Sequence, residues 1–279
     1  MKDEKLTIFL SPGELFCIAG SLGLATLPLV GGHYRGRSSE EIREDINRGR
    51  EVLESRGLIK RFGLRQWEVD SSLTSLVEFI AHPEYALVAS SWRKNEFNQQ
   101  VFLYFKARQC LSLTYKDRFF NLTLYRDLKS VSRYVFTWLG IGQQISNEVP
   151  ELDLPITDLG ALFQDLWAEN PDFDPEVLKK AGVPAHDAAH LWEQLSQVTV
   201  VSNLTLLVRE GERFNREGQL FLLLNQINLW LCETLKTAPG SLKFSPLTAA
   251  RATGRVDRYL RGKAGEEPAA NEEEKNVFL

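Results

Sequence analysis

The chain has 279 residues, of which 43% are hydrophobic and 25% are charged, and its formal net charge at pH 7 is −4. This composition is typical of a globular protein with one large domain or two small ones, and it excludes a strongly basic polyanion-binding protein. No apolar run reaches the ~20 residues of a membrane helix, and the N-terminus lacks a secretory signal pattern, so we expect a cytoplasmic protein without membrane insertion. Three cysteines without CxxC spacing, Cys17, Cys110 and Cys232, favour buried free thiols.

A capping box predicts the first helix. Ser11 is followed by Pro12, which suits the first helical position, and by Glu14, which suits the third. The predicted helix, Pro12–Leu22, is apolar on several sides. We therefore expect it to be mostly buried.

A winged-helix-like segment is predicted over residues 38–69. Ser38 and Glu41 form a second capping box, which opens a charged helix that ends at Gly57. A short hairpin with a basic turn follows, formed by residues 58–60 and 66–69.

The rest of the first half predicts one helix, then strands, then a closing helix. Asp70 caps a helix over Ser71–Ala81. Alternation of apolar and polar residues predicts the strands. The strands are expected at 85–92, 101–107, 110–116 and 119–125, and the closing helix at 128–139.

The second half is predicted to repeat this order after a connector over residues 143–156. Its helices are expected at 157–169, 175–181 and 186–197, its strands at 199–209, 219–225, 228–235 and 241–245, and its closing helix at 248–261.

An internal duplication accounts for the two halves. Residues 101–113 align without gaps on residues 219–231 at an offset of 118, and the offset grows along the chain. The predicted fold is therefore α+β, with two units, 1–142 and 157–262, related by a pseudo-twofold axis. A central antiparallel sheet would be flanked by two helical bundles, which hides the open sheet edge of each unit.

The final residues, 263–279, are predicted to be a disordered acidic tail. This segment has too few apolar residues to become ordered on its own. Alanine, asparagine and proline surround its five glutamates, which are Glu266, Glu267, Glu272, Glu273 and Glu274.

No motif supports catalysis or a cofactor. His186 and His190 share a helix face, as two zinc ligands would, but Asp187 stands where the zincin pattern needs glutamate. No phosphate-binding glycine motif or nucleophile elbow occurs. We expect a non-enzymatic protein without a metal or a cofactor.

DNA binding through residues 38–66 is the alternative function. Basic side chains are dense there, and five of them would contact phosphates: Arg48, Arg50, Lys60, Arg61 and Arg65. Six acids on the same helix oppose this interpretation, because the phosphate backbone would repel them. Pairs such as Glu44 and Arg48 are instead typical of a solvated helix face.

Protein binding is the leading interpretation. Two inter-strand loops, residues 93–100 and 210–218, each place a phenylalanine in a polar turn, which is a plausible binding hot spot. The candidate residues are Phe97, Asn98, Phe214 and Asn215. The alternative is that each phenylalanine folds back onto its own sheet.

With this layout the chain resembles the EspG family of type VII secretion chaperones, over about residues 7–262. The match consists of the helices at 11–22, 38–56 and 71–81, the following strands and closing helix, and the second copy. The resemblance implies a pseudo-twofold sheet with helical bundles, and a non-enzymatic protein that binds helical PE–PPE-type secretion substrates. It also implies a client surface on an inter-strand loop and on the C-terminal bundle, whose candidate contacts are Arg251, Arg255 and Arg258.

Overall fold

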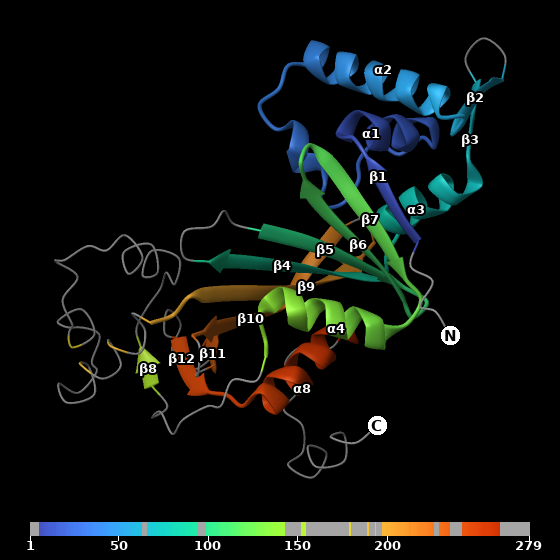
Figure 1. Cartoon of the computed structure of the whole chain (residues 1–279). Helices are drawn as coiled ribbons and strands as arrows, with labels where there is room; N and C mark the ends of the chain where they lie inside the picture. Colours follow the sequence, from blue (N-terminus) through green and yellow to red (C-terminus); the bar gives the residue numbers. More distant parts are fainter. Residues whose placement is uncertain are drawn as a thin grey trace. The chain divides into compact units, whose positions relative to one another are not determined.

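The computed structural model describes residues 6–62, 66–93, 99–142, 152–154, 197–211, 213–225, 229–234 and 242–262, together with Lys179, Ala189 and Glu193 (Figure 1). The chain divides into two compact units. Unit 1 comprises Met1–Val88, Gln100–Val131 and Leu207–Asn215, and unit 2 comprises Ala89–Gln99, Ser132–Leu206 and Arg216–Leu279. The predicted repeats, 1–142 and 157–262, divide the chain differently and stay a prediction.

The α+β prediction is confirmed. Among the described residues, ten strands form an antiparallel sheet in the order β1-β7-β6-β5-β4-β9-β10-β11-β12-β8. The strands are β1 (Leu6–Leu10), β4 (Tyr85–Arg93), β5 (Gln99–Lys106), β6 (Gln109–Lys116), β7 (Phe119–Tyr125), β8 (Leu152–Leu154), β9 (Val200–Glu210), β10 (Arg213–Leu224), β11 (Leu229–Thr234) and β12 (Leu242–Pro246).

The sequence prediction missed two strands, β1 and β8. Leu6 of β1 pairs with Leu124 of β7, and Leu154 of β8 pairs with Leu242 of β12. β8 interrupts the predicted connector, 143–156. Both strands are short and pair with residues far away in the chain, so the local pattern carries little signal for them.

The helical part of unit 1 matches its predicted start and stop signals. It contains α1 (Pro12–Ser21), a 3₁₀ turn η1 (Gly31–Tyr34), α2 (Ser39–Ser55) and α3 (Ser71–Ala81), and the hairpin strands β2 (Ile59–Phe62) and β3 (Gln66–Val69). Both capping boxes form: the Ser11 and Ser38 hydroxyls accept from the Glu14 and Glu41 amides at 3.2 Å. Because these bonds are local, the sequence predicts them well.

Helices α1 and α2 cross with their backbones in contact. A Cβ added to Gly49 would lie 2.2 Å from the carbonyl carbon of Gly13, and one added to Gly13 would lie 2.1 Å from the carbonyl oxygen of Asp45. Only glycine at both positions leaves room for this approach.

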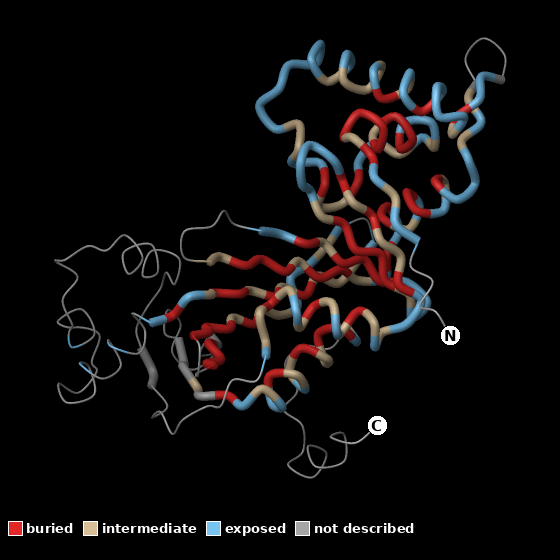
Figure 2. Tube along the Cα trace, viewed as in Figure 1, coloured by how far each residue is buried: buried red, intermediate tan, exposed pale blue. Residues whose placement is uncertain are grey.

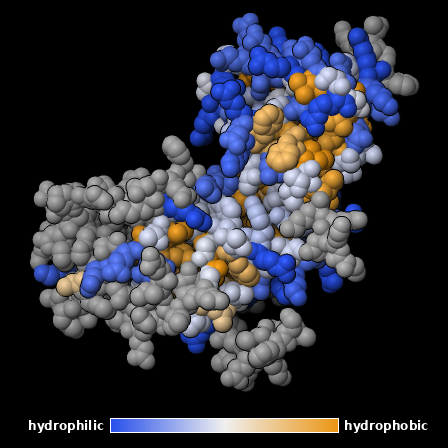
Figure 3. Space-filling view, viewed as in Figure 1, coloured by the Kyte–Doolittle hydropathy of each residue, from blue (hydrophilic) through white to orange (hydrophobic). Residues whose placement is uncertain are grey.

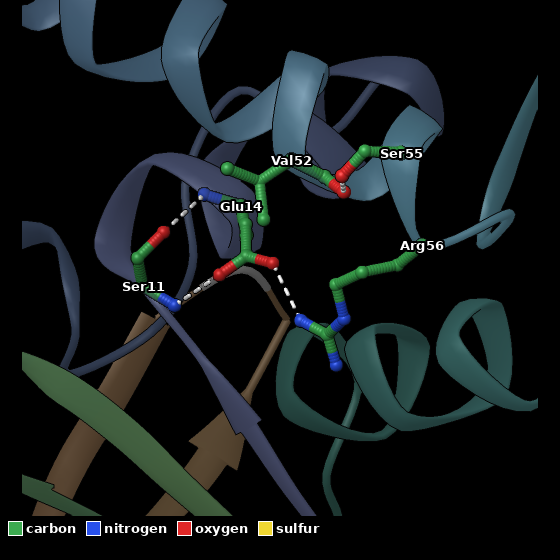
Figure 4. Close-up of polar contacts among 5 residues, drawn as sticks. All are labelled: Ser11, Glu14, Val52, Ser55 and Arg56. Atoms are coloured by element: carbon green, nitrogen blue, oxygen red, sulfur yellow. Dashed lines mark hydrogen bonds and ion pairs between the residues drawn. The ribbon is translucent and has the colours of Figure 1, made fainter.

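An ion pair with a buried carboxylate lies near the same crossing (Figure 4). Glu14 accepts from the Ser11 amide at 2.7 Å and from the Arg56 guanidinium at 2.7 Å, at the end of α2. The Glu14 side chain is 3% exposed and that of Arg56 is 42% exposed. The carboxylate therefore closes the α1 cap and ties α2 to α1 with charge-assisted bonds.

The core of unit 1 lies between one face of its strands and helices α1–α3, and it appears as the buried segments in Figure 2. The helices contribute apolar residues three and four positions apart, and the strands contribute every second residue. They include Leu15, Ile18, Leu53, Leu73, Val77 and Ile80 from the helices and Leu10, Leu111, Leu113, Phe120 and Leu122 from the strands.

The closing helices are α4 (Leu128–Leu139) and α8 (Ala249–Leu260), as predicted. Thr248 caps α8 by accepting from the Arg251 amide at 3.3 Å. In unit 2 the Ser132 hydroxyl of α4 donates to the Asp257 carboxylate of α8 at 2.8 Å. α8 buries an apolar face: Ala252, Val256, Tyr259 and Leu260.

Strand pairing corrects the register of the proposed repeat. Leu103 pairs with Ser112, and a shift of 119 carries them onto the pair Leu222 and Leu231. With this shift the burial patterns of 101–105 and 220–224 are identical. The predicted offset of 118 would exchange the two sheet faces, because side chains alternate along a strand. The duplication itself stays a prediction.

Candidate protein-binding surface

Helix α8 carries three arginines on one face, which we call the arginine stripe: Arg251, Arg255 and Arg258. Their spacing of four and three residues places them one above another along the helix. Arg251 is exposed, and the other two are half-buried. The stripe flanks the buried apolar face of α8, so packing against unit 2 holds the helix that carries it.

The acid of α8 is directed away from the stripe. Asp257 is the helix's one acidic residue, and it accepts from Ser132 of α4. It lies roughly 100° or more around the helix from each stripe arginine, at 100° per residue. Asp257 therefore lies on a different face of α8 from the stripe.

Gly254 lies between the ends of the stripe and is exposed. A Cβ added there would meet nothing within 4 Å. A partner could therefore approach the helix backbone at this point.

The structure corrects the placement of Phe214 and Asn215. Both lie in strand β10, which begins at Arg213 and is longer than the predicted strand 219–225. Phe214 is half-buried and packs against the core of unit 1, and the Asn215 amide donates to Glu210 at 2.5 Å. The prediction that Phe214 lies in an inter-strand loop was therefore wrong.

The turn before β10 is held from both sides. The Arg209 guanidinium donates to the carbonyls of Gly211 at 2.8 Å and of Ala81, at the end of α3, at 3.1 Å. Residues 213–218 are polar and resemble a loop in sequence, but cross-strand hydrogen bonds extend the strand through them. The other predicted loop residues, Phe97 and Asn98, lie outside the described residues.

Two of the five candidate DNA-binding residues make cation–π contacts within unit 1. The guanidinium carbons of Arg50 and Arg61 lie 5.4 Å and 5.8 Å from the Trp67 ring centroid, in the range of cation–π contact. Arg48 and Lys60 are exposed, and Arg65 lies outside the described residues. Arg50 of α2 and Arg61 of the hairpin thus share one aromatic side chain.

Four exposed apolar side chains on β1, β6 and β7 were not predicted from the sequence. Large hydrophobic side chains are 44–56% exposed there: Leu6, Phe9, Tyr115 and Phe119. Phe9 pairs with Asn121, two residues from Phe119, so the two phenylalanines share a sheet face. Leu6 pairs with Leu124 and Tyr115 with Phe120, so these two side chains belong to the opposite face. Figure 3 shows hydrophobic atoms at the surface of unit 1 in this region. The sequence pattern did not predict β1 as a strand, so the exposed position of Phe9 could not be predicted either.

A ring cluster fixes the loop before α2. The His33 ring lies 5.0 Å from Tyr115 and 5.6 Å from Phe120, and the Tyr34 hydroxyl donates to Asp45 at 2.5 Å. Burial, with a smaller contribution from Arg37, lowers the pKa of His33, and burial together with the Asp45 bond raises the pKa of Tyr34. This arrangement favours the uncharged form of each group.

The predicted buried thiols are confirmed. Cys17, Cys110 and Cys232 are free and buried, and burial raises the pKa of Cys17 and Cys110. The described residues contain no cluster of three metal-ligating side chains. His186, Asp187 and His190 lie outside them. No helix of the described part is long and apolar enough to span a membrane.

Comparison with known proteins supports the fold. No protein-family model and no curated protein matches the chain. It is similar to the solved structure of the Mycobacterium tuberculosis type VII secretion system chaperone EspG5 in complex with a PE25–PPE41 dimer. The TM-score is 0.61 at 14% identity, over 94% of this chain and 98% of that one. The chain has an EspG-like fold.

Proposed function

We propose that this protein is a non-enzymatic cytosolic chaperone that binds a helical protein client of the PE–PPE kind and keeps it soluble for secretion. The observation that carries the proposal is the fold likeness to EspG5 over nearly the full length of both chains. The likeness covers 94% of this chain and 98% of that one, so it is a likeness of the whole fold and not of one segment.

The arginine stripe is the surface that we assign to the client. Arginine is enriched at protein interfaces and among their hot spots, because its planar group binds carboxylates with two parallel hydrogen bonds. The stripe lies on a helix held by buried Val256 and Leu260. A client helix with acidic residues at matching spacing would fit it.

Gly254→Trp tests this surface. Gly254 and Gly20 are exposed helical glycines whose added Cβ would meet nothing within 4 Å. The protein would be co-expressed with PE–PPE-type pairs from its own source, and binding of the recovered complex would be measured by calorimetry. We expect Gly254→Trp to weaken binding at least about tenfold, and the control Gly20→Trp to bind as the unmodified protein does.

Two results would contradict the proposal at different levels. Equal binding by both variants would remove α8 from the client surface while leaving the chaperone role. Failure of every PE–PPE-type pair to co-purify would reject the client class. Retention of DNA at low salt, lost at roughly 0.3 M salt, would instead favour the winged-helix alternative.

A further inference from the structure

We propose that β1 is a docking edge, to which an extended acidic segment of a partner protein adds as a further strand of the sheet. This docking is independent of the proposed chaperone role and uses unit 1, whereas the client surface lies on α8. Three features of unit 1 support it: a strand edge without protection, two exposed phenylalanines beside that edge, and a basic turn at its end.

Strand β1 ends the sheet without the features that usually protect an edge strand (Figure 1). Its residues, Leu6–Leu10, include no charge and no proline, and all five pair with β7 in one continuous register without a bulge. Leu6, Thr7 and Phe9 are exposed, so the described part of the chain leaves this edge accessible. Such an edge presents alternate N–H and C=O groups to an incoming strand.

The face of β1 that is directed away from helices α1–α3 offers an apolar contact to the added strand. Leu10 packs in the core with these helices, so Phe9 is directed to the other face. Phe9 is 56% exposed, and Phe119 of β7, on the same face, is 46% exposed. The Thr7 hydroxyl lies 3.2 Å from that of Thr123, so this polar group already has a partner. Apolar side chains of the added strand would therefore bury Phe9.

A basic turn lies at the end of β1. The turn between β6 and β7 consists of Asp117 and Arg118, and Lys116 precedes it. Leu10, the last residue of β1, pairs with Phe120, so the turn lies at this end of the edge strand. Lys116 and Arg118 are exposed, and within the described ranges neither side chain makes a hydrogen bond or an ion pair. The two cations therefore favour a partner with carboxylates at this end.

The spacing of strands permits this contact. Neighbouring strands lie about 4.8 Å apart, so a strand added beyond β1 lies roughly 10 Å from β7. Arginine and glutamate side chains together span this gap and form charge-assisted hydrogen bonds. In an antiparallel partner the carboxylates belong at the N-terminal end of the segment, because that end lies beside the end of β1.

A second copy of this chain fits the edge less well than an acidic segment does. The strand Leu6–Leu10 carries no charge, and the two acids before it, Asp3 and Glu4, are balanced by Lys2 and Lys5. A second β1 therefore brings no net negative charge to the basic turn. An acidic strand satisfies both the edge and the turn.

Peptide binding to the full chain tests the docking. The probe is a fluorescein-labelled peptide with two N-terminal glutamates, followed by five alternating valines and threonines, which favour the strand conformation. We expect it to bind in anisotropy titrations and to slow amide hydrogen exchange over Leu6–Leu10. The same peptide with lysines in place of the glutamates should bind at least about tenfold more weakly. No binding at about 1 mM peptide, or binding without protection of β1, would overturn the docking.

The turn between β5 and β6 provides a matched control at the other end of β6. It has the same arrangement of charges, with Lys106 and Arg108 around Ala107, and both turn residues have positive φ, as in the β6–β7 turn. All four cations are exposed. K116E/R118E should weaken binding of the glutamate peptide at least about tenfold, whereas K106E/R108E should bind it as the unmodified protein does. Equal binding by the two variants would overturn the docking.

Phe9→Thr tests the apolar contact without removing a strand-forming residue. Because Phe9 is exposed, the variant should fold, which circular dichroism would verify. We expect it to bind the glutamate peptide at least about fivefold more weakly. Unchanged binding would likewise count against the docking.

Sedimentation equilibrium distinguishes the other occupant of the edge. We expect the chain without peptide to be monomeric. A dimer that Phe9→Lys dissociates, by placing a charge on the edge strand, would assign β1 to a second copy and overturn the choice of an acidic partner. Neither this measurement nor the titrations need the client, so failure of the proposed client class would be distinguished from failure of the edge docking.

Discussion

The α1–α2 crossing of unit 1 and helix α8 of unit 2 use helix surfaces in opposite ways. At the crossing, glycine backbones touch and a buried carboxylate ties the helices together. α8 buries an apolar face beside exposed and half-buried arginines. The first arrangement leaves no freedom for substitution at the contact, whereas the second leaves one face of the helix open to substitution.

This difference separates scaffold from site. Backbone contact between helices demands a single geometry, because no side chain can adjust. An anchored helix with a charged face can change its partner through a few side chains without loss of the fold. We therefore expect stability effects to concentrate at the crossing and binding effects at α8.

The largest stability effect is expected from Gly49→Ala. The added Cβ would lie 2.2 Å from the Gly13 carbonyl carbon, so the helices must separate. We expect a loss of about 3 kcal/mol in the free energy of unfolding, measured by urea denaturation. Gly20→Ala, where the Cβ meets open space, should instead stabilise by about 0.5 kcal/mol. Equal effects of the two variants would show that the crossing tolerates a side chain.

Arg56→Met should have the next largest effect. It leaves Glu14 buried without its cation, at a cost of about 2 kcal/mol after allowance for the solvent exposure of Arg56. Arg48→Met on the same helix is the control and should change stability by less than about 0.5 kcal/mol. The double variant Glu14→Gln with Arg56→Met should recover part of the loss. An additive double variant would argue against a direct coupling.

Gly254→Ala should stabilise α8 by about 0.5–1 kcal/mol, because alanine has the higher helix propensity and meets no neighbour. Thermal unfolding would measure the gain. A loss of stability would mean that the surroundings of Gly254 on α8 are packed more tightly than those of Gly20.

The smallest effect concerns pH. Burial lowers the pKa of His33 in the folded chain, so its contribution to stability is present above the ordinary histidine pKa and is lost as the pH falls through that value toward the folded pKa. We expect the melting temperature to fall between about pH 7.5 and 5.5, and to fall less in His33→Phe, which keeps a ring beside Tyr115. Parallel pH profiles would exclude this role of His33.

The candidate site was predicted only in part. The positions 251, 255 and 258 and the closing helix that carries them follow from the sequence, because helical spacing is a local property. The prediction for Phe214 failed, since a polar strand end and a polar loop have the same composition, and only its packing against the core of unit 1 distinguishes them.

Local hydrogen bonds explain what could be foreseen from residues alone: the capping boxes at Ser11 and Ser38, the hairpin of β2 and β3, and the strand alternation of β6. Contacts between distant residues needed the folded chain. They include the pairing of β1 with β7, the pairing of β8 with β12, and the Gly13–Gly49 contact. The physical reason is that the role of a strand edge or of a glycine depends on the segment that packs against it, and that segment lies far away in the sequence.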